Sequence, residues 1–154
     1  MDLLKIFNTM ARQPGGKWLF SRAVAAKAPY FQSIAPRMEE LSATHAVARL
    51  RKRRSVTNHI GTVHAIAICN LAEFAAGVLA EVACPPTARW IPQSMSVEYL
   101  AKAGTDLRAQ ATFPADLDWA QAQTVPIPVD VQDTHGTTVF RAEIRMYCSP
   151  KRAA

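Results

Sequence analysis

The stretch Asn58-His59-Ile60-Gly61-Thr62-Val63-His64 runs directly into a long apolar segment, 65–83, and this junction decides the fold. The segment is apolar on every side, so it predicts one long helix that other parts of the chain enclose. Pro85-Pro86 follows and predicts where this helix ends. The first backbone N–H groups of a helix have no partner inside it. A polar turn at this point therefore predicts a place where an oxyanion or a phosphate binds.

The apolar segment is nearly long enough to cross a bilayer, but its composition favours another interpretation. Four residues interrupt the segment, namely Asn70, Glu73, Gly77 and Glu81. Charged side chains are costly at membrane depth, so these interruptions favour the buried helix of a soluble protein. We therefore expect no membrane span.

Two features predict a cytoplasmic protein. Residues 1–10 lack a long apolar stretch with a cleavage site, so they predict no export signal. The three cysteines, Cys69, Cys84 and Cys148, show no metal-ligand spacing and leave one thiol unpaired in any disulfide scheme. This usage favours a reducing compartment and gives no indication of a metal site.

Part of the net charge of +6 lies in one run of basic residues, Arg49, Arg51, Lys52, Arg53 and Arg54. Such a run suits phosphates in nucleic acid, on a membrane or on coenzyme A, although alternate basic residues on a strand also form an ordinary solvated face. No aromatic platform interleaves the charges, and no zinc-binding or helix-turn-helix pattern is present. We therefore expect no nucleic-acid partner.

Alternating apolar and polar residues dominate the rest of the chain and predict strands. One strand is expected over 44–56, ahead of the polar turn. Further strands are expected after the helix, at 88–91, 94–100, 106–113, 125–132 and 137–148. Pro126 and Pro128 predict that the strand over 125–132 begins at an edge or a bulge. Over residues 1–42 we expect helical and irregular structure, with one helix over 17–27 that ends before Pro29.

This order of elements predicts an α+β fold. Strands and helices do not alternate along the chain, which excludes a doubly wound parallel sheet. A helix that is apolar all round must be enclosed, and a curved antiparallel sheet wrapped around it is the simplest enclosure. At 154 residues and 49% apolar composition, we expect one domain, 1–154, with an N-terminal helical segment, 1–42, and a core, 44–148.

Glu73 is the first candidate for chemistry. On a helix, Ile66, Asn70, Glu73 and Gly77 fall on one stripe. A carboxylate among apolar neighbours is partly desolvated, and this state suits a general base. An ion pair with an arginine of the basic run, or exposure to solvent, would explain the same acid without catalysis. The residues alone favour such a structural role.

The polar turn supplies three more candidates, and two of them, His64 and Asn58, each have two interpretations. His64 either donates a hydrogen bond to a substrate carbonyl or caps the free N–H groups of the helix. Asn58 either orients an attacking water or forms an Asn turn through its own side chain. Gly61 is most simply explained by backbone geometry. Asn70 is most simply explained by hydrogen bonding in the core.

These residues resemble a motif of the hotdog-fold thioesterase superfamily. In its phenylacetate-pathway-type acyl-CoA thioesterases, the motif is close to Asn-x-x-Gly-x-x-His-Gly-Gly, with a helical acid nine residues beyond the His. Asn58, Gly61, His64 and Glu73 match these positions, whereas the Gly-Gly pair is replaced by Ala65-Ile66. The run 53–65 looks most similar to a less characterised bacterial subgroup, as does the upstream segment Ala28-Pro29-Tyr30-Phe31.

The resemblance implies a hotdog fold, in which a curved antiparallel sheet wraps one long central helix, and an acyl-CoA thioesterase. It implies that Glu73 is the base or nucleophile, with Asn58 and His64 as catalytic partners and the helix N-terminus as the oxyanion site. The substrate-binding candidates are then Gly61, Ala65, Ile66, Asn70, Arg53 and Arg54, the two arginines facing the phosphates of coenzyme A. A homodimer, or a dimer of dimers, without cofactor or metal is implied.

Two other functions compete with hydrolysis. A non-catalytic module that binds an acyl thioester or a lipid is favoured by Ala65-Ile66 in place of Gly-Gly, because a β-branched residue there narrows the site. A hotdog dehydratase or hydratase ranks lower. Those relatives commonly carry an Asp about six residues before the His, where this chain has Asn58.

Overall fold

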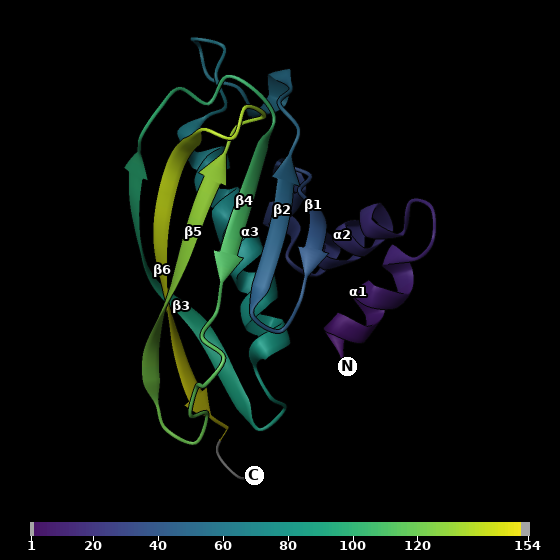
Figure 1. The fold of residues 1–154 in the computed structure, drawn as a ribbon, viewed down its shortest axis with the longest axis vertical. Coiled ribbons are helices and arrows are strands. Elements are labelled where there is room, and N and C mark those ends of the chain that lie inside the picture. Colours follow the sequence, from purple (N-terminus) through teal and green to yellow (C-terminus); the bar gives the residue numbers. More distant parts are fainter. Residues whose placement is uncertain (1, 152–154) are drawn as a thin grey trace.

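The computed structural model describes residues 2–151, and these form an antiparallel sheet wrapped around one long helix (Figure 1). The order of the six strands is β1-β2-β4-β5-β6-β3. The helices are α1 (Leu3–Ala11), α2 (Gly16–Lys27) and α3 (Ala65–Ala83), with short 3₁₀ helices η1 (Pro29–Ser33) and η2 (Arg54–Val56). The strands are β1 (Arg37–Leu41), β2 (His45–Leu50), β3 (Ala88–Tyr99), β4 (Leu107–Thr112), β5 (Gln123–Gln132) and β6 (Thr138–Pro150). The predicted α+β hotdog fold is confirmed.

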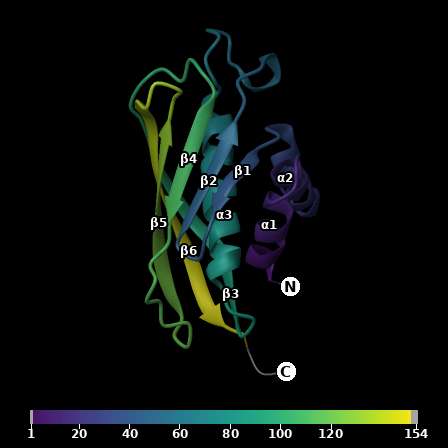
Figure 2. The same cartoon turned by 45° about the vertical axis from the view of Figure 1, so that its right-hand side comes forward.

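Helix α3 lies between the sheet on one side and the N-terminal helices on the other (Figure 2). It begins and ends at the residues that the sequence predicted. Its length and apolar composition would suffice to cross a membrane, but most of the helix is buried inside the protein. The inward residues of the neighbouring strands are buried as their alternation predicted, for example Leu107, Val129 and Ile144. Burial of these two apolar faces against each other is the main driving force of the fold.

The helix predicted over 17–27 is confirmed as α2, which packs on α1 and on β1. The rings of Phe7 and Phe20 meet edge to face with centroids 5.1 Å apart. The Ser21 hydroxyl accepts a hydrogen bond from the Met38 N–H at 2.8 Å. These contacts attach the N-terminal helices to the edge of the sheet that β1 forms.

Three of the predicted boundaries were wrong. Residues 37–41 form β1, where only helical and irregular structure was expected. The strand predicted over 44–56 ends at Leu50, so Arg51, Lys52, Arg53 and Arg54 do not lie on a strand. The segments 88–91 and 94–100 are one strand, β3, whose pairing with β6 shifts between Pro92 and Ser94.

The expected edge at the start of β5 is confirmed. The pairing of β4 with β5 ends at Ala111 and Val129, so Pro126 and Pro128 lie beyond it and have only β6 as a paired neighbour. Proline lacks the N–H group that a second neighbouring strand would need. The turn at 133–136 joins β5 to β6, with the Gly136 N–H donating to the Asp133 carbonyl at 3.2 Å.

Candidate functional site

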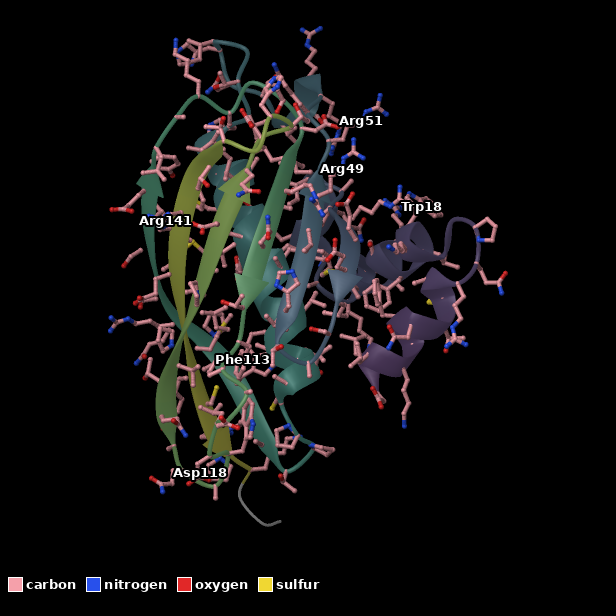
Figure 3. All side chains as sticks on the ribbon, viewed as in Figure 1. Trp18, Arg49, Arg51, Phe113, Asp118 and Arg141 are labelled. Atoms are coloured by element: carbon pink, nitrogen blue, oxygen red, sulfur yellow. The ribbon has the colours of Figure 1, made fainter. Side chains whose placement is uncertain are left out.

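The segment 51–64 connects β2 to α3 and positions the start of the helix. Figure 3 shows Arg49 and Arg51 at this end of the molecule. The His64 N–H donates to the Val56 carbonyl, and the Val63 N–H donates to the Ala103 carbonyl, each at 2.9 Å. These two bonds fix the backbone immediately before α3, so the direction in which the helix leaves the loop is determined locally.

His64 is the N-cap of α3. Its Nδ1 accepts a hydrogen bond from the Ile66 N–H at 3.1 Å, and its backbone is extended with φ −64° and ψ 137°. The side chain therefore satisfies one of the unpaired donors of the first turn, as a capping residue does. Of the two roles that the sequence left open for His64, the capping role is therefore present in the structure. A contact between His64 and substrate stays a prediction.

Asn58 forms the turn through its own side chain. Its Oδ1 accepts from the N–H groups of Ile60 and Thr62, at 3.2 and 3.1 Å, and its Nδ2 donates to the Thr62 hydroxyl at 2.8 Å. Gly61 has φ +78°, which a residue with a Cβ rarely adopts. The turn geometry is therefore built into Asn58 and Gly61, and a direct role of Asn58 in catalysis stays a prediction.

Glu73 lies on the wall of a cavity of about 530 Å³, called here the larger cavity. The side chain is half-buried, and within residues 2–151 its carboxylate makes no hydrogen bond or ion pair. An ion pair with an arginine, which would have given Glu73 a purely structural role, is therefore absent from the described residues. The cavity lies between α3, the N-terminal segment and β3, and its lining is Leu3, Val24, Lys27, Ala28, Phe31, Glu73, Gly77, Val78, Glu81, Trp90 and Pro92.

A second cavity of about 190 Å³, the smaller cavity, adjoins the first turns of α3. Hydroxyl and amide side chains are prominent in its lining, which consists of Tyr30, Ser33, Ile34, Ser55, Val56, Thr57, His64, Ile66, Ala67 and Asn70. The structure thus places three of the predicted site residues, His64, Ile66 and Asn70, on the wall of one cavity. It places Glu73 in the other cavity of the same chain. Asn58, Gly61 and Ala65 line neither cavity.

Residues 27–34, called here the roof segment, border both cavities. Phe31 lines the larger cavity and packs its ring edge to face on Phe74 with centroids 5.3 Å apart. Arg53 donates from its guanidinium to the carbonyls of Ile34 and Ser33, at 2.9 and 3.2 Å. Arg53 therefore anchors the roof segment, whereas Arg54 is exposed.

Sequence reasoning missed the residues that the fold adds to the site from other elements. Trp90 of β3 borders the larger cavity, and its indole N–H donates to the Glu81 carboxylate at 2.9 Å. Ser33 borders the smaller cavity and accepts from Asn70 Nδ2 at 3.3 Å. The segment Ala28-Pro29-Tyr30-Phe31 was the one signal for the roof, because it resembled the same bacterial subgroup as the motif.

A contact between Cys69 and Tyr99 connects α3 to the edge strand β3. The Cys69 Sγ and the Tyr99 hydroxyl lie 3.5 Å apart. This contact, together with burial, raises the pKa of Tyr99 to about 12. The phenol is therefore neutral near pH 7 and does not act there as a base. Within residues 2–151, no group of three or more His, Cys, Asp or Glu side chains has an arrangement that would hold a metal ion.

Comparison with known proteins places this architecture in a family. A family model described as a domain of unknown function, DUF4442, matches residues 16–148. A structural-genomics protein of known structure, APC5556, is 43% identical with a TM-score of 0.83, and the match covers 97% of this chain and 99% of that one. No curated protein matches the sequence.

More distant solved structures share the fold. A protein of unknown function from Pseudomonas aeruginosa, described as a probable thioesterase, is 20% identical with a TM-score of 0.76, and the match covers 82% of this chain and 91% of that one. A thioesterase from Haemophilus influenzae is 10% identical with a TM-score of 0.70, and the match covers 80% and 85% of the two chains. The chain therefore belongs to the DUF4442 family, and its architecture is the hotdog fold that the resemblance of its motif implied.

Proposed function

We propose that this protein hydrolyses an acyl thioester, with Glu73 as the general base or the nucleophile. The observation that carries the proposal is the half-buried carboxylate of Glu73, which has no partner within residues 2–151 and lies on the wall of a largely apolar cavity. A carboxylate in such a place is available to activate water or to attack a carbonyl carbon. The names of the P. aeruginosa and H. influenzae proteins with this fold support the same chemistry.

The larger cavity is the natural place for the acyl group. It is the cavity that contains Glu73, and Val24, Phe31, Val78 and Trp90 give it apolar walls. Burying an apolar chain against such walls is favourable and directs the thioester carbonyl toward the carboxylate. Gly77, one turn beyond Glu73, leaves the space between α3 and Trp90 open.

The oxyanion contact is assigned to the N-terminus of α3, by way of Ala65 and Ala67. The N–H of Ile66 is already bonded to His64. Within the described chain, the N–H groups of Ala65 and Ala67 have no protein acceptor. Partial positive charge and free donors at a helix start stabilise a developing oxyanion. The replacement of Gly-Gly by Ala65-Ile66 is compatible with this arrangement, because the Ile66 side chain is 54% exposed.

A homodimer would bring the two halves of this site together. In one chain, Glu73 and the start of α3 border different cavities. Strand β3 is long and forms an open edge of the sheet, a feature that proteins usually cover. A two-fold contact along this edge would place Glu73 of each protomer beside the helix start of its partner.

Arg54 is the better candidate for the phosphates of a coenzyme A substrate. Arg53 uses its guanidinium to hold the roof segment, so its replacement would disturb structure as well as binding. Arg54 is exposed at the same end of the molecule and forms no ion pair within residues 2–151. Its planar guanidinium suits bidentate contact with a phosphate.

The test of this proposal is hydrolysis of acyl-CoAs from acetyl to palmitoyl, with aromatic examples, followed at the thioester absorbance. We expect Glu73→Gln and Glu73→Ala to lower kcat by at least about 100-fold, because they remove the base. Glu81→Gln is the matched control, since it neutralises a carboxylate on the same helix and in the same cavity. Full activity of the Glu73 variants would disprove the assignment.

The second candidate function is a binding module for acyl thioesters without turnover. The observation that favours it is the bond from Ile66 N–H to His64, which removes one donor from the oxyanion site. Tight binding of acyl-CoA with no hydrolysis across the panel would establish this function in place of the first.

A further inference from the structure

Asn70 is the residue whose polar atoms the fold satisfies least. It is only 4% exposed, and its Nδ2 donates to the Ser33 hydroxyl at the long distance of 3.3 Å. Within residues 2–151, its Oδ1 is the one buried side-chain oxygen or nitrogen without a hydrogen-bond partner. A buried acceptor with no donor is costly, so proteins retain one where something else supplies the donor.

Asn70 lies at the wall of the smaller cavity. Asn70, its partner Ser33, His64 and Ala67 all line that space. Ala67 and Asn70 are three residues apart on α3 and therefore lie on neighbouring parts of one helix face. The residue whose free N–H is assigned to the oxyanion and the residue with the unpaired Oδ1 thus line the same space, about one helical turn apart.

An acyl thioester has two chemically different halves, and the two cavities differ in the same way. The acyl half is apolar, as are most walls of the larger cavity. In coenzyme A and in acyl carrier proteins, the thiol half is a pantetheine arm, in which two methylene groups separate the sulfur from an amide N–H. A carbonyl oxygen at the Ala67 N–H and an amide about one helical turn, roughly 5 Å, further along α3 have a comparable spacing.

We propose that the Oδ1 of Asn70 accepts a hydrogen bond from the amide N–H nearest to the sulfur of the thiol arm, so that the smaller cavity is the pantetheine subsite. The inference rests on the proposed thioester hydrolysis and names the part of the substrate that this site recognises. Because Oδ1 is buried, the proposal requires that the long Asn70–Ser33 hydrogen bond breaks and that the roof segment moves away from α3 when the arm binds. The approaching amide then satisfies an acceptor that the free protein leaves unpaired.

The first experiment compares two substrates that differ only in this donor. One is the octanoyl thioester of N-acetylcysteamine, and the other is its ester counterpart, in which oxygen replaces the amide N–H. We expect the wild-type protein to hydrolyse the amide substrate with a kcat/KM at least about tenfold higher, because the ester leaves Asn70 unpaired. Equal rates for the two substrates would overturn the proposal without any variant being made.

Substitutions then test whether the Oδ1 of Asn70 causes the preference for the amide substrate. Asn70→Leu has nearly the same shape but no acceptor, and we expect it to lose the preference while it still hydrolyses the ester substrate. Asn70→Asp retains an acceptor and should keep the preference. Ser33→Ala is the matched control, since it removes the partner of Nδ2 and leaves Oδ1 in place. A preference that survives in Asn70→Leu would overturn the assignment.

Binding separates this proposal from the proposed function. The affinity of pantetheine itself is measured by calorimetry for the wild-type protein and for Asn70→Leu. Binding that the substitution weakens at least about tenfold, in a protein that hydrolyses nothing, would refute hydrolysis and support the subsite. Absent or equal binding in both would mean that Oδ1 holds an internal water only, and the subsite would be wrong. Turnover of octanoyl-CoA against octanoyl carrier protein identifies which carrier supplies the arm.

Discussion

Glu73 and His64 come from the same motif, but the chain uses their polar atoms differently. The Nδ1 of His64 accepts the hydrogen bond that caps α3, whereas the carboxylate of Glu73 has no partner within residues 2–151. A polar group that is already hydrogen-bonded within the fold is less available to react with a substrate than one left unpaired in a cavity. This difference is why the proposed reaction is centred on Glu73.

Gly77 sets the space available beyond Glu73. A Cβ at this position would lie 3.4 Å from the Trp90 ring, which Glu81 holds by a hydrogen bond of 2.9 Å. We expect Gly77→Leu to shift the preferred acyl-CoA to a shorter chain, with kcat/KM for the longest substrates falling at least about tenfold. Acetyl-CoA should be affected least. Gly77→Ala is the control, and an unchanged chain-length profile in Gly77→Leu would show that the acyl group lies elsewhere.

At the scale of single elements, the start of α3 depends on the His64 cap. Replacing His64 by Ala removes the acceptor for the Ile66 N–H, and we expect the free energy of unfolding to fall by about 1 kcal/mol. Chemical denaturation measures this change. His64→Asn supplies another capping oxygen and should restore most of the loss. Equal stability of His64→Ala and the wild-type protein would show that the cap contributes nothing.

Asp106 joins the end of β2 to the start of β4. Its carboxylate accepts from the Arg49 guanidinium at 2.6 Å and from the Lys52 N–H at 2.8 Å. The hydrogen bond from Arg49, followed by that from Lys52, lowers the pKa of Asp106 below its ordinary value of 3.8. Its contribution to stability is therefore complete above pH 3.8 and is lost as the pH falls through the lowered pKa.

Asp106→Asn should consequently destabilise the protein by about 1 kcal/mol at pH 7. The difference from wild type should shrink as the pH drops below 3.8, because protonation removes the charge from the wild-type side chain. Urea unfolding at a series of pH values measures both effects. A difference that stays constant across that series would contradict the role assigned to the carboxylate.

Regular sequence patterns predicted the helices and strands well, whereas segments with an irregular pattern were predicted poorly. The bounds of α3 followed from its apolar composition and the prolines beyond it. Strand β1 was missed because its pairing shifts between Met38 and Glu40, which breaks the alternation. The shift between Pro92 and Ser94 made β3 resemble two strands. A bulge changes which face each later residue takes, and a period-two pattern cannot represent that change.

In the candidate site, likewise, the sequence could suggest the contacts between nearby residues but not those between distant ones. The Asn58 turn and the His64 cap involve residues within a few positions of each other, so the sequence could suggest them. The separation of Asn70 from Glu73 into different cavities depends on the roof segment, which arrives from about 40 residues earlier in the chain. Packing over such a distance leaves no periodic signal.

At the scale of the whole molecule, the proposed site requires two chains. We expect light scattering to give at least twice the chain mass of 16.9 kDa. Glu73→Gln removes the base, and Ile66→Trp blocks the smaller cavity through a side chain that is already 54% exposed. Each variant alone should be nearly inactive, and co-refolded mixtures should recover about a quarter of wild-type activity, since half of the dimers then contain one intact site.

The outcome of mixing distinguishes a shared site from a site within one chain. If each chain carried a complete site, every protomer in the mixture would keep its own defect and no activity would return. A wild-type protein that is fully active as a monomer would contradict the proposed assembly as well. Wild type mixed with inactive Glu73→Gln provides the reference for dilution by inactive chains.

The roof segment borders both cavities, with Phe31 in one and Ser33 in the other. Any displacement of this segment therefore changes both spaces at once. By thermodynamic linkage, the affinity for an acyl group and the affinity for a thiol arm must then alter each other by the same factor. In the proposed dimer, these two spaces of one chain belong to different sites, because each site combines the larger cavity of one chain with the smaller cavity of its partner. The roof segment would thus couple the two sites of the dimer, so that an acyl group bound at one site alters the affinity for a thiol arm at the other.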